Sequence, residues 1–499
     1  MTDTVDVRSG VYHDSVTLMQ VSQQVRTTPG VTDALIGMGT ELNLGLMRDG
    51  GFDVPGAAGP NDLVVALRGS DEGALGAGLA RLEEVFAELR ARSRRTGTAE
   101  EVAPRTVGSA AARSGANLAL ISTPGRHAVA DALDAVRSGL SVMLFSDNVS
   151  VEDEIRLKDA AAAADVLVMG PDCGTAVVGG AYLGFANVTR PGRFGVVAAS
   201  GTGAQQVMCL LDLAGEGVSH VLGLGGRDLS DAVGGRSAKQ ALRALAADEA
   251  TEHVIIVSKP ASPAVVEELT ALAGELGVGV SWATLGRGLP DLTAATEVAL
   301  TAAGGTVPEW PWWAAVEPRP AGEPGQGEHL RGLYCGGTLA DEAMIITEEQ
   351  LGPIASNIPL EGSPQVSGHE PLTGHAVIDF GDDELTQGRA HPMIDPSLRL
   401  EKIREQGTDA TCGVLLLDLV LGHGSHPDPA RELADAVSAA RSAAREDGRQ
   451  LPVVVALVGT ESDPQGLKAC AATLSQAGAQ VHTSHAQAVR TALQLLARP

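Results

Sequence analysis

The feature that most constrains the fold of this chain is a regular alternation of short aliphatic runs with longer segments rich in Ala and Leu. The short runs have the length and composition of buried strands. They occupy residues 31–37, 61–67, 117–122, 141–145, 165–169, 194–198, 219–224, 253–257, 332–335, 376–380, 413–419 and 452–458. Segments of helical length lie between them, among them 80–90, 128–138, 204–214, 263–276 and 430–444. This order predicts right-handed βαβ units and an α/β fold with largely parallel sheets.

The composition agrees with sheets that are buried on both faces. Aromatic residues make up only 3% of the chain and hydrophobic residues 44%, so the cores must consist of aliphatic side chains. Parallel strands covered by helices on both sides have this composition. A chain of 499 residues is too long for one core, and roughly three or four domains are expected.

Breaks in composition divide the chain into domains. The clearest break, at 304–326, is rich in Pro, and we expect its tryptophans to hold a linker against a neighbouring domain. Softer breaks lie at 91–104 and 189–193. The predicted parts are an amino-terminal α/β domain at 1–100, further α/β domains at 101–190, 191–305 and 331–499, and a linker at 306–330.

Charge and cysteine content exclude several classes of partner. With 36 Lys and Arg against 62 Asp and Glu, the formal net charge is −26, which repels nucleic acid and anionic membranes. The five cysteines are scattered and never spaced as CxxC, so neither a disulfide framework nor a metal site is expected. The amino terminus has no basic and apolar leader, and no uncharged apolar run of about 18 residues occurs. We therefore expect a cytoplasmic location.

Two glycine-rich turns are candidate anion sites. Residues 194–206 read as a buried strand, a turn of small residues and a helix, and residues 332–344 repeat this arrangement. Backbone N–H groups at the start of a helix bind anions, and the helix dipole adds partial positive charge. The predicted phosphate- or substrate-binding residues are Ser200, Gly201, Thr202, Gly203, Gly336, Gly337 and Thr338. We expect both helices to point at one ligand across a domain interface, although either motif alone is also typical of an ordinary helix cap.

A third glycine-rich turn, with Gly225 and Gly226, places Arg227 after the predicted strand 219–224. An arginine in this position is suited to bidentate binding of a carboxylate or phosphate, so Arg227 is predicted to be catalytic. The alternative is a plain βα turn with the arginine in solvent.

The segment 379–399 has an unusual density of charged residues between Gly and Pro. Loops at the carboxyl ends of strands are where α/β proteins place binding groups. Arg389 and His391 are therefore predicted to be catalytic, Arg389 by recognising an anionic group and His391 by donating a proton. A solvated acidic loop is the alternative.

The turn formed by Gly422, His423 and Gly424 follows the predicted strand 413–419. We expect it to contact substrate. Its histidines have no second cluster of residues with ligand spacing, so a metal site is not predicted there.

Several of these segments resemble known families. The motifs MGPDCG (169–174), RPGRFGVVAASGTG (190–203) and LGLGGRDL (222–229) resemble glycine-rich turns of the succinyl-CoA synthetase α-subunit, within a resemblance that spans 116–258. Residues 413–496 are similar to the carboxy-terminal domain of the β-subunit. GLYCGGTLADEA (332–343) and DFGDDELTQGRAHPMIDPSLR (379–399) resemble signatures of the FdrA proteins, and that resemblance covers nearly the whole chain.

The resemblance implies a multi-domain architecture. A Rossmann-like, CoA-binding-type domain at 101–190 is followed by two flavodoxin-like, succinyl-CoA-synthetase-like domains of the ligase type at 191–305 and 331–499. We expect the protein to form an oligomer.

The chain departs from the synthetases at their catalytic histidine. Lys259 stands where they have a supporting glutamate, and the following stretch 276–290 contains no histidine, so covalent phosphorylation is not expected. The FdrA resemblance implies an enzyme, a subunit of oxamate carbamoyltransferase in ureide or allantoin catabolism. Its substrates would be carbamoyl phosphate, phosphate and oxamate-like anions, and its partners the other subunits of that complex. The alternatives are a CoA-dependent acyl-CoA synthetase without the phosphohistidine and a non-catalytic scaffold subunit. CoA is the one cofactor suggested, and none is required.

Overall fold

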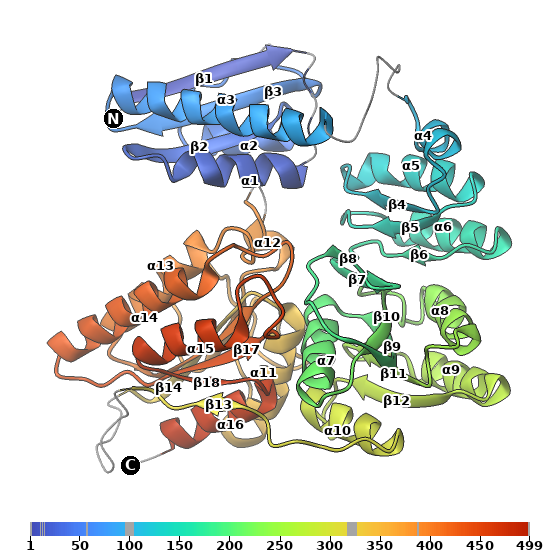
Figure 1. Ribbon diagram of the computed structural model, residues 1–499. Helices are drawn as coiled ribbons and strands as arrows, with labels where there is room; N and C mark the ends of the chain where they lie inside the picture. Colours follow the sequence, from blue (N-terminus) through green and yellow to red (C-terminus); the bar gives the residue numbers. More distant parts are fainter. Residues whose placement is uncertain are drawn as a thin grey trace. The chain divides into compact units, whose positions relative to one another are not determined.

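A computed structural model describes residues 2–9, 11, 13, 15–55, 58–94, 104–316, 327–386 and 389–497. The chain forms two compact units, Met1–Ala110 with Gln387–Ala390, and Ala111–Thr386 with His391–Pro499. Each unit has sheets and cores of its own (Figure 1). None of the helices in the described ranges has the length and apolar character needed to cross a membrane.

The first unit is a three-stranded sheet with helices on both faces. The strands are β1 (Thr2–Ser9), β2 (Val31–Met38) and β3 (Asp62–Gly69), in the order β1-β3-β2. The helices are α1 (Ser15–Arg26), α2 (Glu41–Asp49) and α3 (Glu72–Arg94), with α4 (Val107–Ser114) across the boundary between the units.

Alternation along β3 explains why both faces of this sheet are covered. Leu63, Val65 and Leu67 pack with side chains of α1 and α3, whereas Val64 and Ala66 pack with side chains of α2. Successive side chains of a strand point to opposite faces, so β3 is buried on both sides. The prediction of largely parallel sheets is wrong here, since β1 and β2 both pair antiparallel with β3. The central strand separates the two halves of the β1–α1–β2 unit, so those parallel strands do not pair with each other.

The second unit contains three sheets that are mainly parallel, as predicted. The first consists of β4 (Leu118–Ile121), β5 (Ser141–Leu144) and β6 (Val168–Met169), all parallel, with α5 (Gly125–Arg137) and α6 (Val151–Ala163) between them in the chain. With three strands, it is the smallest of the three sheets.

The second sheet has the order β12-β11-β9-β10-β7-β8. Its parallel strands are β9 (Pro191–Ala199), β10 (Val218–Gly223), β11 (His253–Ser258) and β12 (Gly279–Thr284). The hairpin of β7 (Thr175–Val178) and β8 (Ala181–Gly184) adds antiparallel strands at one edge, although both lie in the predicted segment 101–190. The helices are α7 (Gly201–Leu213), α8 (Arg236–Ala247), α9 (Pro263–Leu276) and α10 (Leu292–Ala302).

The third sheet has the order β13-β18-β17-β16-β14-β15. Its parallel strands are β14 (His329–Tyr334), β15 (Ala376–Asp379), β16 (Cys412–Val420), β17 (Val453–Val458) and β18 (Ala479–His482). The helices are α11 (Gly337–Leu351), α12 (Asp383–Thr386), α13 (Ser397–Thr408), α14 (Pro429–Glu446), α15 (Leu467–Gln476) and α16 (His485–Leu496). The fold is therefore multi-domain α/β, as the alternation of aliphatic runs predicts.

The predicted linker joins the third sheet through its tryptophans. The short strand β13 (Trp312–Trp313) pairs antiparallel with β18. Trp310 is buried, and its Nε1–H donates to Glu297 Oε1 at 2.7 Å. Trp310 therefore holds this segment against α10, and β13 holds it against β18.

Candidate functional site

The candidate site begins at the amino terminus of α7. The buried strand β9 ends at Ala199, and Ser200 caps the helix by accepting a hydrogen bond from Gly203 N–H at 3.0 Å. A β-carbon at Gly203 would lie 2.4 Å from Ser200 Oγ, so only glycine fits beneath this cap. The turn predicted from the sequence is thus an N-cap that presents the first amide groups of a buried helix.

Helices α7 and α11 lie next to each other between the second and third sheets (Figure 1). Their amino termini meet. Ser200 Oγ and Thr338 Oγ1 lie 2.7 Å apart and share a hydrogen bond. A β-carbon at Gly336 would lie 2.7 Å from the Thr202 side chain. The two hydroxyls are 138 residues apart in the sequence, and the two turns therefore form one structure. Because two positive helix ends converge there, the junction is suited to bind an anion.

Lys259 supplies a full positive charge beside this junction. It follows β11, and its Nζ lies 2.9 Å from Asp341 Oδ2 of α11. Nζ would be 3.3 Å from a β-carbon at Gly337, the first residue of α11. Burial acts to lower the pKa of Lys259, but the neighbouring carboxylates, chiefly Asp341, raise it above its usual value. The lysine is therefore a fixed cation next to the helix ends.

Asp379, the last residue of β15, places a carboxylate on the same junction. The side chain is buried, Oδ1 accepts Gly381 N–H at 2.9 Å, and Oδ2 would be 2.7 Å from a β-carbon at Gly337. Burial raises the pKa of Asp379 to about 7, although the Gly381 amide and the charge of Lys259 oppose the shift. Asp379 can therefore gain or lose a proton near neutral pH.

A second carboxylate, Asp172, titrates in the same neighbourhood. It lies in the turn after β6, which includes a cis peptide bond between Gly170 and Pro171. Desolvation of the Asp172 carboxyl raises its pKa to about 6, and the negative charges of Asp147 and Asp383 raise it further. In the same turn, burial raises the pKa of the Cys173 thiol to about 12, so Cys173 is not a nucleophile near neutral pH.

His391 lies close to Asp379 but is uncharged. Its Nδ1 accepts Met393 N–H at 3.3 Å, so the neutral ring carries its hydrogen on Nε2. Nε2 would be 2.8 Å from a β-carbon at Gly381, and the ring packs on Phe185 with centroids 5.5 Å apart. Burial lowers the pKa of His391 to about 4. It can thus donate a hydrogen bond from Nε2 near neutral pH but carries no positive charge.

Arg389, the other residue predicted from that segment, is exposed and belongs to the first unit. Its predicted role in recognising an anionic group stays a prediction.

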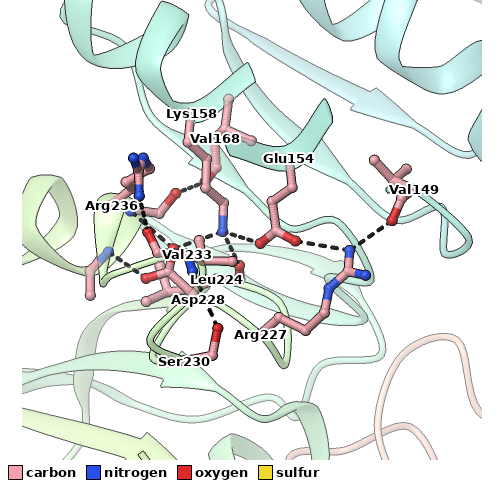
Figure 2. A network of polar contacts seen from close by, with 12 residues as sticks. Val149, Glu154, Lys158, Val168, Leu224, Arg227, Asp228, Ser230, Val233 and Arg236 are labelled. Atoms are coloured by element: carbon pink, nitrogen blue, oxygen red, sulfur yellow. Dashed lines mark hydrogen bonds and ion pairs between the residues drawn. The ribbon is translucent and has the colours of Figure 1, made fainter. Parts of the chain in front are cut away.

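Arg227 lies in a network that joins the domain of β4–β6 to that of β9–β12. Its Nη2 donates to Val149 O at 2.8 Å and forms an ion pair with Glu154 Oε2, also at 2.8 Å. Figure 2 shows Lys158 reaching from α6 between Glu154 and Asp228, with Nζ 2.7 Å from an oxygen of each. Arg227 is therefore already paired within the protein, and its predicted catalytic role stays a prediction.

The remaining predicted glycines lie where backbones cross closely. Gly225 has φ +81°, and a β-carbon there would lie 2.0 Å from Pro171 O, whereas nothing lies within 4 Å of the corresponding position at Gly226. Gly225 thus packs the turn after β10 onto the cis-proline turn of Asp172. The predicted binding of phosphate or substrate by Gly225 and Gly226 stays a prediction.

The turn of Gly422, His423 and Gly424 packs against the segment that follows β8. His423 N–H donates to Ala186 O at 2.8 Å, and a β-carbon at Gly422 would lie 2.5 Å from the same oxygen. A β-carbon at Gly424 would lie 3.0 Å from Gly184 O. The turn therefore forms part of the contact between the second and third sheets, and its predicted contact with substrate stays a prediction.

Lys259 and Asp379, the charged side chains beside the helix ends, are absent from the predicted set of site residues. Lys259 lies two residues after the predicted strand 253–257, and Asp379 is the second-last residue of the predicted strand 376–380. The carboxyl ends of parallel strands are where α/β proteins bind ligands, so this position was the available signal. Sequence alone does not bring the two strand ends together, because they belong to different sheets.

Comparison with known proteins identifies the class and the family. Residues 333–495 match the family described as CoA-ligase, and together with the parallel sheets this makes the chain a CoA-ligase-like α/β protein. It is 36% identical over 499 residues to the uncharacterized protein YahF of Escherichia coli (strain K12), across 96% of this chain and 95% of that protein. The chain belongs to the family of YahF. The FdrA resemblance stays a prediction.

Similarity to succinate–CoA ligases covers a smaller part. The α-2 subunit of the ADP-forming enzyme from Trichomonas vaginalis, which is mitochondrial, is 29% identical over 152 residues, 30% of this chain and 48% of that protein. The α-2 subunit from Archaeoglobus fulgidus is 28% identical over 158 residues, 31% of this chain and 54% of that protein. The dinucleotide-forming acetyl-coenzyme A synthetase 1 of Ca. Korarchaeum cryptofilum aligns over 80% of this chain and 88% of its own, at 16% identity. Its TM-score of 0.31 is too low to carry an argument.

Residues 1–104 match a family described as AllF, heavy metal-associated domain. These residues include no cysteine and a single histidine, His13, which stacks on Phe86. Soft thiolate ligands are what selects soft metal ions, so the residues present do not fit a heavy-metal site. Within the described ranges, no group of three or more His, Cys, Asp or Glu side chains is placed to hold a metal ion.

Proposed function

We propose that the chain is a subunit of a carbamoyltransferase that acts on carbamoyl phosphate, or a similar acyl phosphate, in ureide- or allantoin-type nitrogen catabolism. The observation that carries the proposal is the junction of α7 and α11, where Ser200 Oγ and Thr338 Oγ1 lie 2.7 Å apart. Two helix ends and the Lys259 ammonium surround this point, which suits a doubly charged phosphoryl group.

The same groups favour transfer of the carbamoyl group from phosphate. When the bond between the carbamoyl carbon and the phosphate oxygen breaks, negative charge grows on that oxygen. Amide N–H groups and an ammonium that are already in place stabilise this charge without reorganisation. The sequence has no histidine between His253 and His329, which favours direct transfer over a histidine phosphorylated in that stretch.

A second candidate function is CoA-dependent acyl transfer. It is favoured by the match of residues 333–495 to the CoA-ligase family and by the partial similarity to succinate–CoA ligase α-subunits. In that case the domain of β4, β5 and β6 would hold CoA, and the junction of α7 and α11 would hold an acyl phosphate.

Calorimetric titration of the full chain with carbamoyl phosphate, phosphate, oxamate and CoA separates the two candidates. We expect binding of carbamoyl phosphate and phosphate, and a fall in affinity of about 10-fold or more in Lys259→Met, since a hydrogen bond to a charged group is lost. Lys259→Arg should retain most of the affinity because it keeps the charge. Lys239→Met is the matched control, because Lys239 lies on α8 and pairs with Glu268 on α9.

Each outcome of these titrations has a meaning. Binding of CoA without carbamoyl phosphate or phosphate would favour the acyl-CoA synthetase. Absence of binding by all four ligands would favour a scaffold subunit. Equal affinity for phosphate in wild type and Lys259→Met would remove the junction as the binding site.

A further inference from the structure

We propose that Asp379 is the general base of the site, the group that takes the proton from the acceptor nitrogen as the carbamoyl group is transferred to it. The inference rests on the proposed function and adds a catalytic residue to it. It starts from the position of a buried carboxylate against the anion-binding helix ends.

Asp379 is directed at the first turn of α11. Its Oδ2 would lie 2.7 Å from a β-carbon at Gly337, and Lys259 Nζ would lie 3.3 Å from the same point. The carboxylate and the ammonium thus flank one backbone position at the helix end. An acyl phosphate bound there would have the carboxylate beside it, on the side occupied by β15.

The protein holds Asp379 in one orientation. The Asn357 side chain accepts Asp379 N–H at 2.9 Å and donates to Asp379 O at 2.8 Å, so it clamps both backbone groups of the residue. Oδ1 accepts Gly381 N–H at 2.9 Å. Within the described part of the chain no hydrogen bond ends on Oδ2, which leaves this oxygen for a ligand proton. Asn357 is therefore a positioning residue.

The proton balance of the reaction fits this placement. The acceptor nitrogen forms a bond to the carbamoyl carbon, and the bond from that carbon to the phosphate oxygen breaks, with its electron pair leaving on phosphate. The nitrogen gives its proton to Asp379 Oδ2, and the protonated carboxyl then passes it to the departing phosphate. The products are the N-carbamoyl compound and hydrogen phosphate, and Asp379 returns to its starting state.

The pKa of Asp379 supports its role as the general base. Burial raises the pKa of Asp379 to about 7, which is close to the value at which a base is both available and strong near neutral pH. Asp172, whose pKa is raised to about 6 by its surroundings, is the competing candidate. No contact with the helix ends of α7 or α11 comes from Asp172 among the described residues, and this separates it from Asp379.

The test uses the full chain and two readouts, with Asp379→Asn, Asp172→Asn and the control Glu401→Gln. Glu401 is an exposed carboxylate on α13. The first readout is the number of protons taken up when carbamoyl phosphate binds, measured by calorimetry in buffers with different ionisation enthalpies. A dianion next to Asp379 raises the pKa of its carboxyl, so wild type should take up a fraction of a proton at about pH 7. Asp379→Asn should bind carbamoyl phosphate at least as tightly and lose most of this uptake.

The second readout is the rate of phosphate release from carbamoyl phosphate in the presence of oxamate. Asp379→Asn should lower it by roughly 10²–10⁴-fold. The limb near about pH 7 in the profile of kcat/KM, which reports the free enzyme, should disappear. Glu401→Gln should change neither readout.

Unchanged proton uptake in Asp379→Asn, or a loss of uptake in Asp172→Asn instead, would overturn the assignment while leaving the carbamoyl phosphate site in place. If wild type does not bind carbamoyl phosphate at all, both the proposed function and this inference fall.

Discussion

Removal of the Lys158 ammonium is the perturbation whose cost follows most directly from the structure. Lys158 is fully buried, and its Nζ contacts Glu154 Oε1 and Asp228 Oδ1 at 2.7 Å and Leu224 O at 3.1 Å (Figure 2). Lys158→Met preserves the length of the side chain but leaves two buried carboxylates without this partner. Loss of one member of a buried ion pair costs about 3–5 kcal/mol.

The surviving contacts place the expected cost at the lower end of that range. Glu154 keeps its ion pair with Arg227, and Asp228 still accepts the N–H groups of Ser237 and Ala238 at the start of α8. We therefore expect Lys158→Met to destabilise the contact between α6 and the turn after β10 by about 3 kcal/mol.

Hydrogen exchange is the appropriate assay, because a multi-domain chain does not unfold in one step. A loss of about 3 kcal/mol should accelerate the exchange of the slowest amides in β4, β5 and α6 by roughly 100-fold, if these open as one unit. The amides of β16 and β17, in the third sheet, should keep their rates.

Arg156→Met is the matched control on the same helix. Arg156 is exposed and pairs with Asp153 at the surface, so its loss should cost about 0.5 kcal/mol or less. Adding Asp228→Asn to Lys158→Met should recover part of the loss, since one unpaired charge is removed. If Lys158→Met and Arg156→Met give the same exchange rates, the reasoning about buried charge is refuted.

Three further predictions concern the junction of α7 and α11. Gly337→Ala should weaken phosphate binding by about 10-fold or more, because its β-carbon would lie 2.7 Å from Asp379 Oδ2. Gly201→Ala should weaken binding less, because a β-carbon there meets Thr175 Oγ1 at an ordinary 3.5 Å. Equal losses of affinity in the two variants, measured by calorimetry, would contradict this steric explanation. Because folding raises the pKa of Asp379 from 3.8 to about 7, its contribution to stability is lost as pH rises through about 7. Above that pH, Asp379→Asn should slow the exchange of the slowest amides of β14 and β15 by the equivalent of up to about 4 kcal/mol, an effect that must vanish below about pH 4. The pKa of His391 is lowered from 6.5 to about 4, so its contribution to stability is present above about pH 6.5 and lost toward pH 4. His391→Gln should therefore reduce the acceleration of amide exchange in the third sheet between about pH 6.5 and 4, and an unchanged acceleration would argue against a neutral ring in the folded protein.

The class of the fold was determined largely by local sequence. Aliphatic runs of strand length and Ala/Leu-rich segments of helix length depend on neighbouring residues alone, and they predict the parallel strands β9–β11 and β14–β17. The strands β12 and β18 are absent from the prediction. The small residues at 200–203 and 336–338 likewise predict two helix starts that present backbone N–H groups, and both occur. These features follow from short-range periodicity and from turn geometry, which depend only on neighbouring residues.

Only the tertiary structure decided which side chains meet. The sequence does not show that the sheet of the first unit is antiparallel, because the direction of pairing depends on which strand lies between the others. Nor does it show that Arg227 is paired with Glu154, a partner more than 70 residues away. Lys259 and Asp379 were overlooked for the same reason: each is ordinary at the end of its own strand, and the pKa of Asp379 is shifted only by burial in the folded protein. Long-range contacts and desolvation arise from the packing of the folded chain, so the local sequence pattern does not predict them.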